Sequence, residues 1–315
     1  MINKRTVFVL GAGANVPYGF STGGGLIDKA RGIDPRELMG NAGDQIRRIE
    51  SDAFRRAAFD NLLPSIDSML EHRPDLAKVG KWVMATLLYR QEATAAPRSF
   101  EEDWMSLVFA YMSEDASTLE EFAQNPVSFI TFNYDRYLEH RFIRGLVARY
   151  SVSPREAWAK IATMFIHLYG SLGDLPEQVP EGQETHAVPL GAPDTDDVYT
   201  LGLALPKAEN SIRIVYDSEQ PPDSFTDAWK RFQTSQQVLF LGFGFGKKNV
   251  ARLRTNAIPN SVTIDCTTYE MTKAEVLDLV LSSFPGRDLG AVRRRDKPDT
   301  TSVRIFLRER VDWFR

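Results

Sequence analysis

The sequence is poorest in cysteine and histidine. It has one cysteine, Cys266, and four histidines among 315 residues. A single cysteine excludes an intramolecular disulfide and any zinc site that is built from several cysteines. The same scarcity is typical of proteins from a reducing compartment, so we expect a cytoplasmic protein.

Long hydrophobic runs and an excess of positive charge are also missing. The apolar run near the N-terminus, Thr6 to Leu10, is too short for a signal peptide, and no later run approaches the length of a membrane span. The net charge is −4 and the isoelectric point is near 5.7, which argues against broad electrostatic attraction to nucleic acid. We therefore expect neither a membrane partner nor direct binding of nucleic acid.

What the sequence does contain is a hydrophobic fraction of 43% and several short apolar runs that end in glycine or polar residues. Such runs are typical of buried strands in a parallel sheet. With the helical patterns between them, they predict an α/β fold, a Rossmann-like and mostly parallel sheet with helices on both faces. Residues 35–125 have mostly helical spacing. We interpret them as a helical insertion subdomain after the first strand, and residues 1–34 and 126–315 as the Rossmann-like domain.

The first glycine-rich stretch follows the run Thr6 to Leu10 directly and consists of Gly11, Ala12, Gly13, Ala14 and Asn15. Glycine after a buried strand lets the backbone turn tightly and approach a ligand, and a helix that begins there favours phosphate. Position 16 is Val16, where the dinucleotide fingerprint has a third glycine, so an ordinary strand-to-helix turn is the alternative. Thr22 is expected to cap a helix from Gly23 to Arg31.

The central stretch of the chain runs from Val127 to Asp135. The apolar run ends in Thr131, and Asn133 and Asp135 follow it immediately before a helical pattern. In open α/β sheets, ligands bind in the crevice at the carboxyl ends of the strands. We therefore expect these polar side chains to line a ligand site.

A second buried strand is predicted over Ala162 to Ser171, with Gly170 and Ser171 at its end. His167 and Tyr169 would then share one face of that strand, because strand side chains alternate. They could line one pocket about 6.6–6.8 Å apart along the strand. For His167 the alternative is a hydrogen-bonded histidine of the core.

Two further strands are predicted near the end of the chain. Val238 to Leu241 leads into alternating glycines that include Gly242 and Gly244. Asn260 to Asp265 ends in a carboxylate that could accept hydrogen bonds from ribose hydroxyls or cap the next helix.

The remaining predictions concern the connecting segments. We expect short extended patches at 186–190, 198–201 and 212–216, a basic turn at 293–295 and a final strand at 301–307. Helices are expected over 137–150, 153–160, 224–236, 247–255 and 273–284.

As an ordered set, these motifs resemble the sirtuin-like (SIR2-like) domains of bacterial anti-phage defence proteins. The matching pieces are the first glycine stretch with Pro17-Tyr-Gly19 and Thr22-Gly23, then Thr131-Phe-Asn-Tyr-Asp135, His167-Leu-Tyr-Gly-Ser-Leu172 and Leu241-Gly-Phe-Gly-Phe-Gly246. The resemblance covers about residues 6 to 270, nearly the whole chain.

The resemblance implies a domain that binds NAD+ in an extended pocket. It implies that the first glycine loop lies against the phosphates, that Asn133 and Asp135 lie at the nicotinamide ribose, and that Gly242 and Gly244 hold the adenosine side. Many defence members hydrolyse NAD+ to nicotinamide and ADP-ribose and so deplete the infected cell, a form of abortive infection. Sirtuins that deacylate lysine carry a four-cysteine zinc module, which this chain cannot build, so no zinc is expected.

The sequence departs from the family pattern at two positions. Tyr169 stands where the family has its catalytic histidine, with His167 two residues upstream, and Asn15 replaces a serine. Tyrosine, with a reference pKa near 10, is a poor base at neutral pH unless its environment is strongly perturbed.

Three functions are therefore open. The first is an NAD+ hydrolase with Asn133 as the central catalytic residue, assisted by Asp135 and by His167 or Tyr169. The second is a subunit or sensor of a defence complex that binds NAD+ or ADP-ribose without turnover. The third, a plain scaffold, predicts no nucleotide binding. No sensor segment is recognisable, so we expect control by homo-oligomerisation or by a separately encoded partner protein.

Overall fold

The computed structural model describes residues 1–38, 46–191, 198–214, 222–269, 271–287, 289 and 302–310. Its centre is a five-stranded, all-parallel sheet with the strand order β3-β2-β1-β4-β5. The strands are β1 (Thr6–Leu10), β2 (Val127–Thr131), β3 (Phe165–His167), β4 (Gln237–Leu241) and β5 (Thr263–Cys266). The predicted Rossmann-like α/β fold is therefore confirmed.

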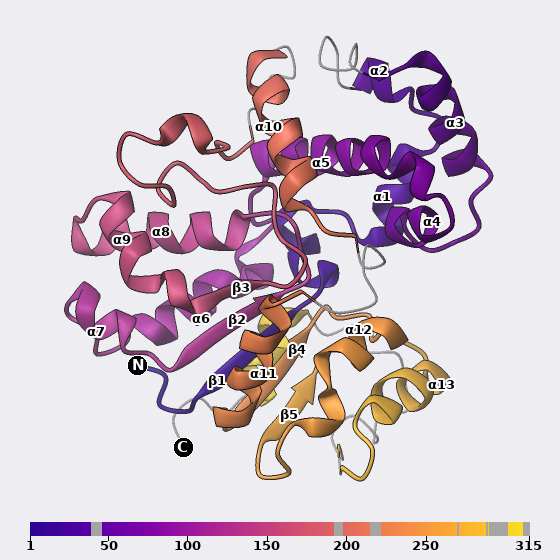
Figure 1. Cartoon of the computed structure of the whole chain (residues 1–315). Helices are drawn as coiled ribbons and strands as arrows, with labels where there is room; N and C mark the ends of the chain where they lie inside the picture. The colour runs from indigo at the N-terminus through magenta and orange to yellow at the C-terminus, as the bar shows by residue number, and fades with distance from the viewer. Residues whose placement is uncertain are drawn as a thin grey trace.

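The strand order explains why the three middle strands are the most apolar. Every residue of β1, β2 and β4 is buried, because these strands are covered on both faces of the sheet. Figure 1 shows α11 (Ser224–Thr234) in front of the strands and α15 (Val303–Arg310, yellow) partly hidden behind them. The order reverses between β1 and β4, which is the place where sheets of this class bind ligands.

A block of helices joins β1 to β2, as the spacing over residues 35–125 predicts. These helices are α1 (Gly23–Ala30), α2 (Pro35–Leu38), α3 (Arg48–Phe59), α4 (Ile66–His72), α5 (Ala77–Thr94), α6 (Trp104–Ser113) and α7 (Leu119–Ala123). In Figure 1, α1 to α5 form a layer above the carboxyl edge of the sheet, and α6 and α7 lie beside it with the later helices. The long helix α5 is buried along most of its length, which fits its position inside this layer.

The remaining helices follow β2. They are α8 (Tyr137–Tyr150), α9 (Pro154–Ile161), α10 (Val198–Ser211), α12 (Lys247–Leu253) and α13 (Lys273–Glu275), the last continued by a π-helical turn over Val276–Val280. The predicted helices over 137–150, 153–160, 224–236, 247–255 and 273–284 are confirmed within a few residues at their ends. Helix α10 packs along α5 and so returns to the upper layer (Figure 1).

Several predicted extended segments are wrong. Of the segment predicted as a final strand at 301–307, residues 303–307 belong to α15, because Val303, Phe306 and Leu307 are buried at helical spacing and Ser302 accepts a hydrogen bond from the Ile305 amide. Residue 301 lies outside the described residues. Residues 198–201 begin α10. Of the patch predicted at 186–190, only His186 lies in a 3-10 turn, and Ala187 after it has an extended backbone. Residues 215–216 and the predicted basic turn at 293–295 lie outside the described residues.

The predicted strand over Ala162 to Ser171 is also too long. A 3-10 turn precedes β3, which ends at His167 after three residues. Gly170 then adopts a left-handed conformation with φ of 78°, which an extended strand does not contain. In the part of the chain that the structure describes, no helix is long and apolar enough to span a membrane.

Candidate functional site

Two glycine-containing loops touch each other at the carboxyl ends of β1 and β4. The Gly11 amide donates to the Leu241 carbonyl at 3.0 Å, and the Gly13 amide donates to the Gly242 carbonyl at the same distance. A Cβ atom on Gly242 would stand 2.0 Å from the Ala14 nitrogen, and its φ of 56° also favours glycine. Glycine is therefore required here for the close packing of two backbones.

A cavity of about 660 Å³ opens at this contact. Five of the sequence-predicted binding residues line it, namely Ala12, Gly13, Thr22, Gly242 and Gly244. Thr22 also caps α1, since its hydroxyl accepts a hydrogen bond from the Gly25 amide at 3.2 Å. The cavity thus lies at the sheet position, between β1 and β4, that the strand order marks for a ligand.

A buried polar pair joins the 3-10 turn Ala12–Tyr18 to the segment after β2, and neither of its residues lines the cavity. The Asn15 amide nitrogen donates to both carboxylate oxygens of Asp135, at 2.9 and 3.0 Å, and both side chains are buried. Burial raises the pKa of Asp135 to about 7, with the charge of Glu92 adding to the rise and the Asn15 hydrogen bond opposing it. Among the described residues, the Asn15 Oδ1 is a buried acceptor that has no hydrogen-bond partner. The pair therefore offers an unsatisfied acceptor and a carboxyl group that titrates near neutrality.

Asn133 lies two residues before Asp135, and two hydrogen bonds hold it in place. Its backbone amide donates to the Thr131 hydroxyl at 3.0 Å, and its side-chain nitrogen donates to the Gly11 carbonyl at 3.3 Å. The side chain of Asn133 thus bridges the end of β2 to the first glycine loop. Asn133 does not line the cavity, and its role in a ligand site stays a prediction.

His167 is engaged on both sides of its ring. Its Nδ1 lies 2.9 Å from the Asn133 backbone oxygen, and its Nε2 pairs with the Glu139 carboxylate of α8. Burial disfavours the charged ring, but the charge and hydrogen bond of Glu139 and the Asn133 carbonyl together raise the pKa of His167. A charged, paired imidazole is poorly suited to act as a general base, and it fixes the position of Asn133 instead.

Tyr169 does not share the surroundings of His167, because the strand ends between them. The Tyr169 hydroxyl donates to the Asn249 oxygen and accepts from Arg252, each at 3.0 Å, and both partners belong to α12. Its side chain is buried. The expectation of a common face for these two side chains is therefore wrong.

Gly170 and Ser171 turn the chain away from the sheet. A Cβ atom on Gly170 would stand 1.8 Å from the Ser211 carbonyl oxygen, so this position also requires glycine. The Gly173 amide donates to the Ser171 hydroxyl at 3.3 Å. Neither residue lines the cavity, and their contacts shape the turn between β3 and the next loop.

Asp265 lies within β5, opposite Leu239, and its Oδ1 accepts a hydrogen bond from the Cys266 amide at 3.2 Å. It does not line the cavity. The strand continues to Cys266, so the first residue beyond its carboxyl end is Thr267, which lines the cavity and accepts a hydrogen bond from the Gly242 amide at 2.8 Å. In the sequence, Thr267 is recognisable as a cavity residue only because it is a polar residue directly after the strand.

The cavity residues that the sequence did not predict include four with ionisable side chains, namely Arg98, Glu102, Tyr269 and Glu275. Arg98 and Glu102 come from the segment after α5, and the Arg98 amide donates to the Pro17 carbonyl at 3.0 Å. Tyr269 follows β5, and its side chain is 55% exposed. No local pattern marks these residues, because only the packing of distant segments brings them to the cavity.

A fully buried ion pair ties the site to the helical layer. Arg136 donates to both carboxylate oxygens of Glu92 on α5, and it also donates to the carbonyls of Gly173, Val188 and Pro189. Since Arg136 follows Asp135 directly, the ion pair anchors the segment that carries Asp135. The hydrogen bonds of Arg136 offset the desolvation cost of burying two charges.

Comparison with known proteins adds no relative to this description. No protein-family model, no curated protein and no solved structure matches the chain.

Proposed function

We propose that the chain binds NAD+ at the cavity between β1 and β4 and hydrolyses its nicotinamide–ribose bond. The observation that carries the proposal is the buried pair of Asn15 and Asp135 beside the glycine contact. The nicotinamide carboxamide has an N–H donor for the unpartnered Asn15 Oδ1. It also has an oxygen that can accept a hydrogen bond from Asp135 when that carboxyl group is protonated.

The glycine contact is suited to bind the pyrophosphate part of NAD+. Backbone that is free of side chains, beside the N-terminus of α1, suits a pyrophosphate group. Arg98 adds a positively charged side chain to the cavity lining. A ligand with a carboxamide at one end and phosphates in the middle matches the chemistry of both parts, and its carboxamide has to reach the buried pair from the cavity, which the pair does not line.

The reaction requires a site that holds the ribose and admits a water molecule. The bond between nicotinamide nitrogen and ribose carbon breaks, its electron pair leaves with nicotinamide, and water adds to the carbon and loses a proton. Asn133 is the residue that we assign to orienting the water or a ribose hydroxyl, because a carboxamide does so without charge. The alternative role of Asp135, in its ionised form, is to stabilise the positive charge that develops on the sugar instead of donating to the carboxamide.

Release of nicotinamide from NAD+ by the purified chain tests this function. We expect turnover by the wild type and a loss of at least about 100-fold in the Asn133→Ala variant, which removes a positioned polar group. Asn210→Ala, an exposed substitution on α10, is the matched control and should retain full activity. Full turnover by Asn133→Ala would rule out the assignment of Asn133.

A second candidate, binding without turnover, is favoured by one specific observation. Both side chains expected to assist as bases are already engaged, His167 by Glu139 and Tyr169 by Asn249 and Arg252. On this account, calorimetry detects binding of NAD+ or ADP-ribose while nicotinamide release stays at background. Appearance of turnover in the Tyr169→His variant would then identify the missing base.

The resemblance to SIR2-like defence proteins suggests a setting for either activity. We propose that the chain acts in antiviral defence by sensing or depleting NAD+, and that self-association or a separately encoded partner protein controls it. Nicotinamide release measured against protein concentration, together with light scattering, tests the first form of control. A purely monomeric protein with concentration-independent activity and no co-purifying partner would argue against both forms.

A further inference from the structure

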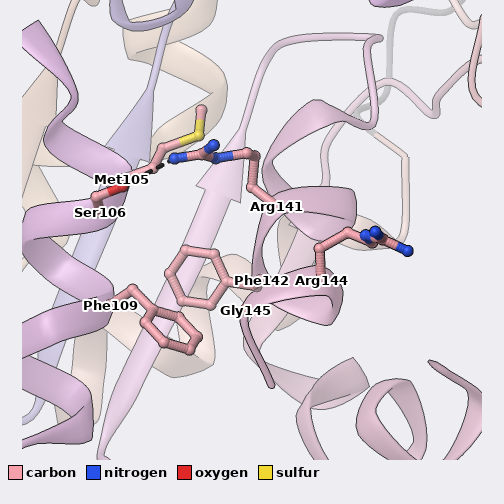
Figure 2. Close-up of a pocket in the computed structure, with 7 residues that line it drawn as sticks. All are labelled: Met105, Ser106, Phe109, Arg141, Phe142, Arg144 and Gly145. Atoms are coloured by element: carbon pink, nitrogen blue, oxygen red, sulfur yellow. Dashed lines mark hydrogen bonds between the residues drawn. The ribbon is translucent and has the colours of Figure 1, made fainter. Parts of the chain in front are cut away.

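A second cavity, of about 370 Å³, lies between α6 and α8, away from the glycine contact. Its apolar floor consists of Met105, Phe109 and Phe142. The two phenylalanine rings meet edge to face with centroids 5.6 Å apart (Figure 2). Gly145 on α8 leaves room for the Phe109 ring, since a Cβ atom there would stand 2.8 Å from it. Met105 and Phe142 are each only 1% exposed, so the half-buried ring of Phe109 provides the aromatic surface of this floor.

The charged lining of this cavity is of one sign. Arg141 and Arg144 line it, and among the described residues no carboxylate does. Figure 2 shows Arg141 turned across the cavity toward Ser106, while Arg144 extends the other way. Arg141 donates one amino group to the Asp103 carboxylate at 2.7 Å and to the Ser106 hydroxyl at 2.8 Å. A guanidinium has five N–H donors, so Arg141 retains donors for a second acceptor.

Asp103 connects this cavity to the first glycine loop. Its carboxylate accepts from Arg141 and also from the hydroxyl of Tyr18, at 2.9 Å. Tyr18 ends the 3-10 turn over Ala12–Tyr18, which lines the ligand cavity, and it is fully buried. The neighbouring Trp104 donates to the Ala14 carbonyl in the same turn at 2.8 Å. Anything that moves Arg141 or Asp103 therefore acts on a residue of the glycine loop.

We propose that the cavity between α6 and α8 binds a small aromatic carboxylate, and that its occupation is transmitted to the glycine loop through Arg141, Asp103 and Tyr18. The ring of the ligand packs on the half-buried ring of Phe109, and its carboxylate pairs with Arg141. Because an Arg–carboxylate pair is a charge-assisted hydrogen bond, the charged head group contributes specificity as well as affinity. This inference goes beyond the proposed function and does not depend on it.

The direct test is binding of 3-phenylpropionate by the full chain, followed by ligand-observed NMR without any nucleotide. Its neutral analogue 3-phenylpropan-1-ol and inorganic phosphate serve as probes that lack the charge or the ring. We expect 3-phenylpropionate to bind at least about tenfold more tightly than either, since the pair with Arg141 and the ring contact both contribute. Equal binding of the acid and the alcohol would overturn the proposal.

Variants of α8 locate the site. Arg141→Gln should weaken binding of 3-phenylpropionate by about tenfold, and Arg141→Lys, which keeps a charged partner for Asp103, should weaken it less. Arg149→Gln removes a positive charge from the same helix outside the cavity and is the control. If the control and Arg141→Gln weaken binding equally, the site is not the one described.

Hydrogen exchange of the peptide that covers residues 12–20 tests the connection to the glycine loop. We expect saturating 3-phenylpropionate to change the exchange of this peptide severalfold in the wild type. The change should be lost in Tyr18→Phe, which removes the hydroxyl that donates to Asp103 and accepts from the Met105 amide of the cavity lining. Binding of 3-phenylpropionate is measured in the same variant, so that loss of the site is distinguished from loss of transmission. Binding without any change in exchange would overturn the proposed transmission.

Discussion

The Nδ1 of His167 lies 2.9 Å from the backbone oxygen of Asn133, so the histidine of β3 holds the asparagine that follows β2. The other ring nitrogen pairs with Glu139, whose side chain is only 3% exposed. His167 thus stands between the candidate catalytic residue and a buried carboxylate, as a positioning residue.

A double-mutant cycle of His167→Ala and Glu139→Gln should reveal this pairing. We expect a coupling of about 2 kcal/mol in the free energy of unfolding, because the two groups share one hydrogen-bonded contact. The pKa of His167 is raised in the folded state, so the coupling should be full at acidic pH and decline as pH rises through that pKa. Urea unfolding at several pH values measures it, and a coupling that grows with pH would contradict the assignment.

The buried carboxyl of Asp135 should give the protein a distinctive pH dependence. Its pKa rises from 3.8 to about 7 on folding, so the folded state binds the extra proton between these values. Stability should therefore fall as pH rises from about 4 to 7, by up to about 4 kcal/mol for this group.

Asp135→Asn isolates this contribution, because the variant keeps the shape and cannot titrate. The free energy of unfolding of the wild type minus that of the variant should decline with rising pH. A difference that is constant across the range would show that Asp135 does not titrate near neutrality in the folded state.

The contact of the two glycine loops can be tested with a pair of alanine substitutions. Gly242→Ala should destabilise the protein by at least about 2 kcal/mol, since the new Cβ meets the Ala14 nitrogen in a left-handed backbone conformation. Gly244→Ala, two residues away with open space around its Cα, should change stability by no more than about 0.5 kcal/mol. Denaturant midpoints compare the two, and equal losses would refute the contact.

Much of this architecture could be predicted from the sequence because the local signals were strong. The runs before Gly11 and Gly242 and after Pro126 are continuous and apolar, and they form the buried middle strands. Short runs that mix apolar and polar residues do not distinguish a strand from a helix. Val303 to Leu307 is such a run, and it forms a helix in which Phe306 and Leu307 are buried.

The site was only partly predictable for a different reason. Asn133 and Asp135 follow a strand in sequence and therefore lie at its carboxyl end. The partners that decide the chemistry are distant in the chain: Glu139 for His167, α12 for Tyr169 and α5 for Arg136. No periodicity or spacing encodes these pairings, which depend on how the helices pack.

The ion pair of Arg136 and Glu92 should be one of the most costly contacts to break. Arg136→Met leaves a fully buried carboxylate without its partner and should destabilise the protein by about 3–5 kcal/mol. Arg73→Ala removes an exposed pair with Asp75 and should cost less than about 1 kcal/mol. Thermal unfolding of both variants checks the contrast, and a small loss for Arg136→Met would show that the loop has other anchors.

The most direct test of the central claim is calorimetric titration of NAD+ into the wild type and two tryptophan variants. Gly244 lines the cavity and Gly246 does not, while neither has an atom within 4 Å of an added Cβ. If NAD+ binds between β1 and β4, Gly244→Trp should weaken binding at least about tenfold by filling the cavity, and Gly246→Trp should leave it unchanged. No binding by the wild type, or equal binding by both variants, would contradict the account.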